Sequence, residues 1–203
     1  MTNPTDRKDP IGTLLATSAA GLYVQFLLQF VAGIVLQARF RPTLEEAHSS
    51  VLGIRADGLG RFLADFHYWG SAMLIVTAGL HVGLMLWFGW YRHPHRVRWF
   101  ASLAMLAGAL GFQLTGNLLP MDRHDVQTAV VEAAIAARIP GIGSELRSAI
   151  LGGDGFGQTT LDLWWGMHRF ALTALVLLAM GAAYVVHRRL GDVRENRVAM
   201  FVP

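Results

Sequence analysis

The chain has 203 residues, of which 53% are hydrophobic and 15% carry a charge. This composition is more apolar than that of a water-soluble domain of similar length, so it excludes an ordinary soluble core. The absence of cysteine excludes disulfides, thiolate zinc sites, cysteine-bound iron–sulfur clusters and covalently attached c-type haem. The formal net charge is +3, but the arginines lie in short clusters between apolar runs, so we expect no nucleic acid partner.

Four stretches are almost free of charged residues over the roughly 20 residues that a helix needs to cross a bilayer core. They are residues 11–38, 66–91, 99–121 and 163–186. We therefore expect an all-α fold, an integral membrane four-helix bundle, in which residues 1–203 form a single domain. Residues 1–10 lack the pattern of a cleaved signal peptide, so the first span is expected to be retained.

Basic residues outside the spans set the expected orientation. The link between spans two and three holds Arg92, Arg96 and Arg98, and Arg188 and Arg189 follow span four. Because short cytoplasmic loops collect Lys and Arg, both regions are expected on the cytoplasmic side of a bacterial inner membrane. With an even number of spans, the N- and C-termini then both face the cytoplasm.

The connection 122–162 is expected on the outer side, and it is long for a bundle loop, which is typical of a functional or docked segment. Residues 126–137 are mostly small and apolar, so they predict a short helix on the membrane surface. The glycine-rich run 152–157 has some likeness to a dinucleotide-binding fingerprint. It lacks the preceding strand and the following amphipathic helix of that fingerprint, so we expect a turn.

Histidines within the spans are the candidate cofactor ligands. His67 and His81 are 14 residues apart on one span, so their rings leave the same helix face about 21 Å apart along the axis. His168 lies on another span. An isolated histidine in a membrane bundle often serves a hydrogen bond between helices. Two at this register, with a third opposite, favour haem or metal levels stacked across the membrane.

Two glycines support a flat cofactor, because glycine lets a backbone approach a planar ring. Gly33 lies late in span one and Gly116 lies late in span three, which is the expected level of His67 and His168. Glycine also serves close packing of membrane helices, so the shared level carries the argument. Arg169 follows the last of these histidines, and a charge at membrane depth by default has a functional partner.

Short motifs occur in a fixed order along these spans and the outer loop. They are Gln29-Phe-Val-Ala-Gly33, His67-Tyr-Trp-Gly70-Ser71, Leu80-His81-Val82-Gly83, Gly116-Asn-Leu-Leu-Pro120, Ile139-Pro140-Gly141-Ile142-Gly143, Gly152-Gly153 and Thr160-Leu161 before His168. In type, order and spacing, residues 15–191 resemble the N-terminal, haem-carrying half of cytochrome b from quinol:cytochrome c and quinol:plastocyanin oxidoreductases.

The resemblance implies a four-helix bundle with two b-type haems, each held between a histidine of span two and a histidine of span four. Carried over residue by residue, the outer haem is bound by His67 and His168 and packs on Gly33 and Gly116. An iron with two imidazole ligands has no open position, so it is expected to pass single electrons rather than bind a substrate.

The inner haem position departs from the pattern of the family. His81 matches its first ligand, but the partner position on span four falls on Ala182 or Ala183. Ala19 and Ser102 stand where the family has its two packing glycines. The chain is thus expected to hold one haem b at the outer position, and the presence of a second haem is left open.

Two residues of span four bear on that open question. Met180 lies one turn before Ala183 and is an alternative axial ligand, or else a packing side chain. His187 is 19 residues from His168, which rotates it by about 100° on the helix, so it is expected to point elsewhere.

Two arginines of the family pattern are missing. Leu163 stands in place of the arginine of T-L-x-R-F, and Ala64 in place of the arginine that the family associates with a haem propionate. Arg169 is expected to supply the missing positive charge to a propionate, with an ion pair to Asp162 as the alternative.

The resemblance therefore implies a haem b subunit of a respiratory or photosynthetic type of redox complex, which relays electrons between the quinone pool and a partner redox protein. Expected partners are other subunits of a membrane redox complex, a separate C-terminal cytochrome b-like subunit, a Rieske or cytochrome c protein, quinone and the lipid membrane. The alternative is a structural membrane anchor that has lost most redox function. A proton carrier is disfavoured because the spans contain no carboxylate.

Overall fold

The structure is a computed structural model that describes residues 10–199, with side chains described as far as residue 189. All regular elements of this range are helical, which confirms the expected all-α class. They are α1 (Pro10–Gln37), α2 (Ala47–Arg55), α3 (Gly58–Trp87), α4 (Arg96–Leu118), α5 (Arg123–Ala136), α6 (Gly143–Leu151), α7 (Gln158–Gly166), a π-helical turn (Met167–Ala171) and α8 (Leu172–Ala199). The expectation for residues 1–9 lies outside the described residues.

Four helices are long and apolar enough to cross a membrane, as the sequence predicts. They are α1, α3, α4 and the continuous helix from α7 through the π-helical turn to Arg189. Large apolar side chains on their outer faces are exposed, for example Val24 at 58% and Leu80 at 64%. This is the arrangement of helices that face lipid rather than water.

The boundaries of the second span are wrong by several residues. The sequence places it at 66–91, whereas α3 begins at Gly58 and ends at Trp87. The first two turns of α3 carry Arg61 and Asp65, which an apolar window excludes. Charged residues at the end of a membrane helix can lie at the interface without ending the helix.

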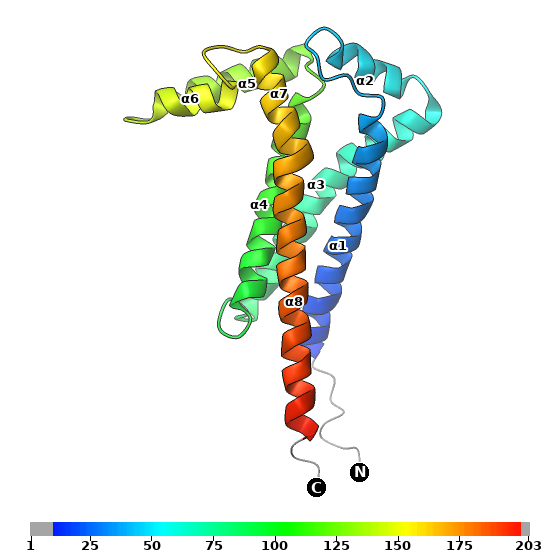
Figure 1. Cartoon of the computed structure of the whole chain (residues 1–203), viewed down its shortest axis with the longest axis vertical. Coiled ribbons are helices and arrows are strands. Elements are labelled where there is room, and N and C mark those ends of the chain that lie inside the picture. The colour runs from blue at the N-terminus through cyan, green and yellow to red at the C-terminus, as the bar shows by residue number, and fades with distance from the viewer. Residues whose placement is uncertain (1–9, 200–203) are drawn as a thin grey trace. The chain divides into compact units, whose positions relative to one another are not determined.

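The chain forms two compact units, each of which contains one part of every spanning helix. Among the described residues, unit 1 comprises residues 10–27, 73–109 and 174–199, and unit 2 comprises residues 28–72 and 110–173. In unit 1, segments of α1, α3, α4 and α8 run alongside one another (Figure 1). A hydrogen bond from Oγ1 of Thr77 to Oε1 of Gln25, at 2.8 Å, joins α3 to α1 there.

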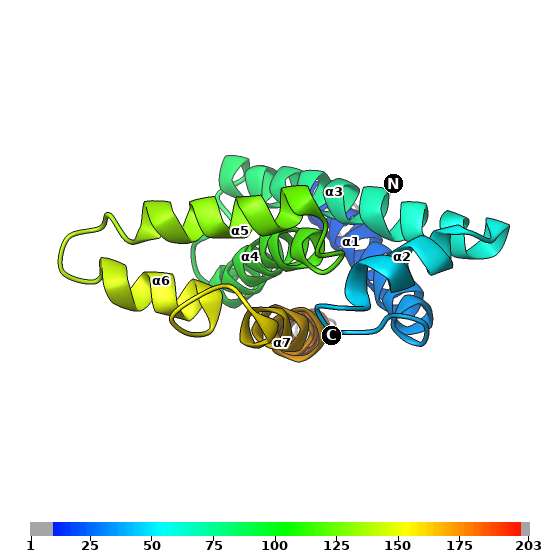
Figure 2. The ribbon, with the colours of Figure 1, turned by 90° about the horizontal axis from the view of Figure 1, so that it is seen from above.

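Unit 2 contains the long outer connection, which is folded rather than loose. Helices α5 and α6 lie side by side in opposite directions (Figure 2). Leu118, Ala129 and Trp164 form a small core between α4, α5 and α7. The indole Nε1 of Trp164 donates a hydrogen bond to the carbonyl of Ile150 at 2.8 Å, which holds α6 against α7.

The predicted short helix at 126–137 is confirmed as α5, which begins three residues earlier, and its place on the membrane surface stays a prediction. Asp122 caps it by accepting a hydrogen bond from the backbone of Asp125 at 2.8 Å, the usual device at a helix N-terminus. The glycine-rich run is a turn, as expected: Gly152 ends α6 in the left-handed conformation with φ 69°, which glycine adopts without steric cost. The short helices α2 and α6 were not predicted, and α7 begins the fourth span five residues earlier than expected.

Candidate functional site

Two histidines face each other inside unit 2. His67 comes from α3 and His168 from the π-helical turn, and their ring centroids are 6.2 Å apart with 68° between the ring planes. The distance from a metal ion to an imidazole nitrogen is about 2.0–2.1 Å for zinc. Two such bonds, together with the distance from each nitrogen to the centroid of its own ring, add up to a separation of this size. The spacing therefore suits one metal ion between the rings.

The glycines at this level leave room for the two imidazoles. A Cβ at Gly33 would lie 3.3 Å from Cε1 of His67, and a Cβ at Gly116 would lie 3.0 Å from Cε1 of His168. Both distances are at or below the tight end of ordinary contacts. From the sequence, these glycines were expected to make room for a planar cofactor. In the structure, each one leaves room for the edge of a histidine ring.

A hydroxyl group orients the second of these rings. Oγ1 of Thr115 lies 2.9 Å from Nδ1 of His168 and 2.7 Å from the carbonyl oxygen of Gly111. Because the hydroxyl proton goes to the carbonyl, Oγ1 accepts the Nδ1 proton of His168. The lone pair of this imidazole is then on Nε2, the atom that a metal ion binds.

Nδ1 of His67 is buried and lacks a hydrogen-bond partner of good geometry among the described residues, although the backbone of Gln29 lies close to the ring. Two facing imidazoles, one of them with an unsatisfied buried nitrogen, fit a cofactor iron, because a buried polar atom is otherwise left unpaired. The donor set is the one that holds a b-type haem.

Gln29 fixes α1 against α3 beside His67. Its side chain is 6% exposed, and its Nε2 donates a hydrogen bond to the carbonyl of Phe66 at 3.3 Å. Gly70 makes this contact possible, since a Cβ there would lie 1.9 Å from Nε2 of Gln29. These two residues are the first and the fourth positions of motifs singled out in the sequence, and the structure brings them into contact.

The backbone around His168 departs from regular α-helix. The amide of Leu172 donates to the carbonyl of Met167, five residues earlier, which defines a π-helical turn. Such turns insert one extra residue and often occur at functional sites. The regular helix assumed for span four is therefore wrong at this point, because the extra residue changes which side chains face inward after it.

Arg169 is not brought into the space between the two rings. Its side chain is exposed, and its guanidinium lies 4.7 Å from the ring centroid of Phe170 and 5.8 Å from that of Trp165. Asp162 accepts a hydrogen bond from Gln158 at 2.7 Å instead. Within residues 10–189 no ion pair joins Arg169 to Asp162, and the pairing of Arg169 with a propionate stays a prediction.

The third histidine, His81, lies in unit 1. It is 5% exposed, and its Nδ1 is 2.8 Å from Oγ of Ser18. The same hydroxyl donates to the carbonyl of Leu15 at 3.0 Å, so it accepts the Nδ1 proton as Thr115 does for its own histidine. The sequence analysis missed both hydroxyl residues. The sequence did contain a signal: Thr115 directly precedes Gly116, and Ser18 directly precedes Ala19, the two positions discussed for cofactor packing.

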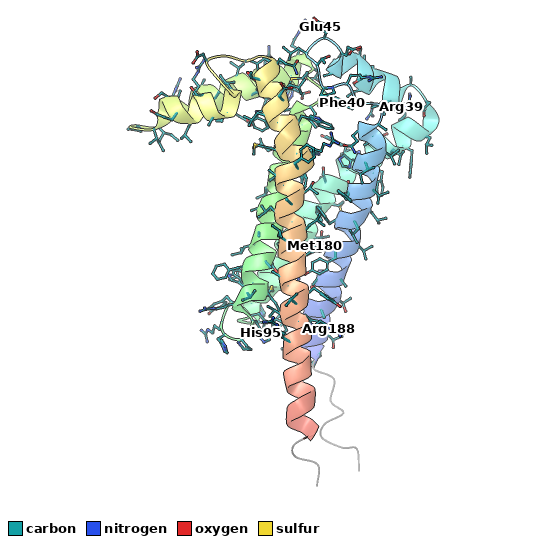
Figure 3. All side chains as sticks on the ribbon, in the orientation of Figure 1. Arg39, Phe40, Glu45, His95, Met180 and Arg188 are labelled. Carbon is teal, nitrogen blue, oxygen red and sulfur yellow. The ribbon has the colours of Figure 1, made fainter. Side chains whose placement is uncertain are left out.

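Ala183 faces His81 across a small cavity in unit 1, and Ala182 is exposed. The sequence left open whether Ala182 or Ala183 stands at the second ligand position of the family, and the structure shows that Ala183 is the one that faces inward. Met180 and Arg188 also lie on α8 (Figure 3). Met180 is half-buried but does not line this cavity, and His187 is exposed, in agreement with the register argument.

One group of three possible metal ligands occurs within the described residues, and it has another role. Asp122, His124 and Asp125 lie close together at the start of α5. Hydrogen bonds from the backbone amides of Asp125 and His124 hold the pKa of Asp122 below its ordinary value, and burial raises the pKa of Asp125. These contacts form the cap of α5, so the cluster is accounted for by helix formation.

Comparison with known proteins agrees with this geometry. A family model described as Cytochrome b(N-terminal)/b6/petB matches residues 72–199. This chain belongs to the N-terminal cytochrome b/b6 family. Cytochrome b6 of Synechococcus sp. (strain RCC307) is 28% identical over 169 residues, which cover 83% of this chain and 78% of that protein. Cytochrome b6 of Mesostigma viride is 29% identical over 167 residues, which cover 82% and 78%.

Among solved structures, a chain of a hyperthermophilic respiratory Complex III has the same fold, with a TM-score of 0.73 and 19% identity. The match covers 86% of this chain and 47% of that chain, so the cytochrome b/b6-type chain spans about half the length of that protein. As a member of this family, it is a haem-containing membrane subunit of an electron-transfer complex. The resemblance stated from the sequence is thereby confirmed.

Proposed function

We propose that this cytochrome b/b6-type chain carries a haem b between His67 and His168 and serves as the electron-relay subunit of a quinol-oxidising membrane complex. The facing imidazoles at 6.2 Å carry the proposal. Support also comes from Gly33 and Gly116, which give both rings the room to adopt this arrangement.

The chain's own residues prepare the site for an iron that only exchanges electrons. Thr115 sets the tautomer of His168, and the contact between Gln29 and Gly70 fixes the helix that presents His67. His67 and His168 would together hold the iron of a bound haem b, which would then exchange electrons without binding a substrate. When bound there, haem b supplies a one-electron carrier. The pairing of Arg169 with a propionate stays a prediction.

The same proposal includes the partners and the orientation. The chain would pass electrons between quinone and a Rieske or cytochrome c protein, together with a separate C-terminal cytochrome b-like subunit. The arginines at 92, 96 and 98 favour a bacterial inner membrane with both termini in the cytoplasm. Both units share all four spanning helices, which favours one membrane domain.

A reduced-minus-oxidised spectrum of the purified full-length chain tests the proposal. The expected result is b-type absorption that is lost in His67→Ala and in His168→Ala. His187→Ala is the matched control, because His187 is an exposed histidine on the same helix, and it should keep the full haem content. A chain without b-type absorption would overturn the proposal and favour the structural anchor.

A further inference from the structure

We infer that the second cofactor position, in unit 1, holds no haem, and that Tyr23, Trp90 and Arg98 close it around a cavity for a single water molecule. The inference rests on the proposed function for the haem at His67 and His168, and it adds that this haem is the sole one of the chain.

The cavity stands at the position where the family pattern places the inner haem. His81, Ala183, Ala19 and Ser102 occupy the four family positions of that site, and all four line this one cavity. Its volume is about 20 Å³. That volume is sufficient for one water molecule. The outline of the site is thus retained, but three of its four family positions have changed, and Ala183 at the second ligand position cannot bind iron.

Three large side chains from three segments line the same cavity: Tyr23 from α1, Arg98 from α4 and Trp90 from the connection between α3 and α4. Ring contacts hold two of them in place. The guanidinium of Arg98 lies 4.7 Å from the ring centroid of Trp90, and Trp90 stacks on His95 at 4.0 Å with 10° between the planes. Figure 3 shows His95 in this connection, directly before the start of α4.

A second axial ligand for His81 is missing from the described lining. The facing residue is Ala183, whose methyl group cannot bind iron. Two methionines also line the cavity, and neither stands at the ligand position that the family has on span four. Met85 lies one turn after His81 on the same helix, and its Sδ accepts a hydrogen bond from Ser102 at 3.2 Å. Met105 lies one turn after Ser102 on α4, the helix that carries a packing position of the family rather than the second ligand.

Nδ1 of His81 is satisfied without iron. Ser18 takes its proton, so Nε2 carries a lone pair. A water in the cavity can donate to Nε2, while Tyr23 and Arg98 supply further polar partners. A buried water needs two to four such partners. His81 is therefore a hydrogen-bonding residue here rather than an iron ligand.

Without a second haem, this chain can relay electrons only at the level of His67 and His168. The chain would serve a quinone and a redox partner at that level, and electron transfer across the whole membrane would need a cofactor from another subunit.

The first experiment is the haem-to-polypeptide ratio of the purified full-length chain, measured by pyridine haemochrome and iron content. The expected ratio is one. A ratio of two would overturn the inference, and a ratio of zero would overturn the proposed function instead. His81→Ala should leave the ratio and the spectrum unchanged, whereas a loss of half the haem in this variant would also overturn the inference.

A second experiment asks whether Trp90, together with Ala19 and Ser102 at the family's glycine positions, is what closes the site. Ala183→His alone should leave the haem ratio at one, because the ligand is restored but the space is not. The same substitution combined with Ala19→Gly, Ser102→Gly and Trp90→Gly should raise the ratio toward two, with the spectrum of the first haem as the control for folding. A ratio of two with Ala183→His alone, or no rise in a folded combined variant, would contradict the inference.

Discussion

Thr115 accepts a hydrogen bond from Nδ1 of His168 at 2.9 Å while donating its own proton to the carbonyl of Gly111. This pair sets the tautomer of the imidazole and raises the basicity of its Nε2, as outer partners do at other metal sites. Thr115 is 1% exposed, so water cannot replace it without rearrangement of the helices.

We predict that Thr115→Val raises the midpoint potential of the haem while its content stays the same. Without an acceptor for the Nδ1 proton, the imidazole donates less charge and stabilises the oxidised iron less. A hydrogen bond of about 0.5–1.5 kcal/mol corresponds to a rise of about 20–60 mV for one electron. Potentiometric titration measures the shift. Thr115→Ser keeps the hydroxyl and should stay near the wild-type potential; equal shifts in both variants would contradict the assigned role.

Gly116→Ala should weaken haem retention, because its Cβ would lie 3.0 Å from Cε1 of His168. Crowding of this kind costs about 1–3 kcal/mol in a packed interior. Gly33→Ala should have a smaller effect, since its distance to His67 is 3.3 Å. The readout is the temperature at which the haem absorption is lost in detergent.

Gly21→Ala is the matched control for these two variants. It lies on α1, and a Cβ there would meet nothing within 4 Å. Alanine is also the better helix former, so haem retention should be unchanged or slightly improved. A loss as large as that of Gly116→Ala would show that the crowding argument is wrong.

Asp57 should make the start of α3, and with it His67, sensitive to acid. The backbone amide of Gly60 and then the Arg39 guanidinium hold the pKa of this carboxylate below its ordinary value. A depressed pKa stabilises the fold above the ordinary aspartate pKa, and this contribution is lost as the pH falls below about 4. Melting temperatures in detergent between pH 7 and about pH 3 should fall less for Asp57→Asn than for wild type. Parallel curves would contradict this prediction.

Thr160→Val should loosen α6 from α7. Oγ1 of Thr160 donates to the carbonyl of Leu151 at 2.6 Å and accepts from the amide of Gly157 at 3.0 Å, and the residue is fully buried. Loss of these bonds leaves buried backbone groups unpaired, at a cost of about 1–3 kcal/mol.

Limited proteolysis across residues 152–157 is the measurement for this variant, and cleavage should be faster than in wild type. Thr159→Val provides the control, because Thr159 is exposed on the same turn. Equal cleavage rates in the two variants would show that the buried hydroxyl does not hold the helices together.

The sequence predicted the spans and the placement of the histidines well, because both follow from local patterns. A run of apolar residues such as 11–38 can only be a membrane helix, and 14 residues return His81 to the helix face of His67. The short helices α2 and α6 were not predicted, because a helix of nine residues with mixed polarity gives only a weak periodic pattern of hydrophobic residues. From the sequence, Arg98 was interpreted only as a signal of the membrane orientation, because nothing in the neighbouring residues indicates that its side chain lines a cavity.

The sequence by itself thus determined the membrane class, the family and the pair of candidate histidines, His67 and His168. The tertiary structure decided which hydroxyl orients which imidazole, and that Ala183 rather than Ala182 lines the cavity beside His81 together with Trp90 and Arg98. The reason is physical: helix periodicity and the exclusion of charge are set by residues near one another in the chain. The contacts of Thr115 with His168, or of Trp90 with its cavity, join segments whose approach depends on the packing of the helices.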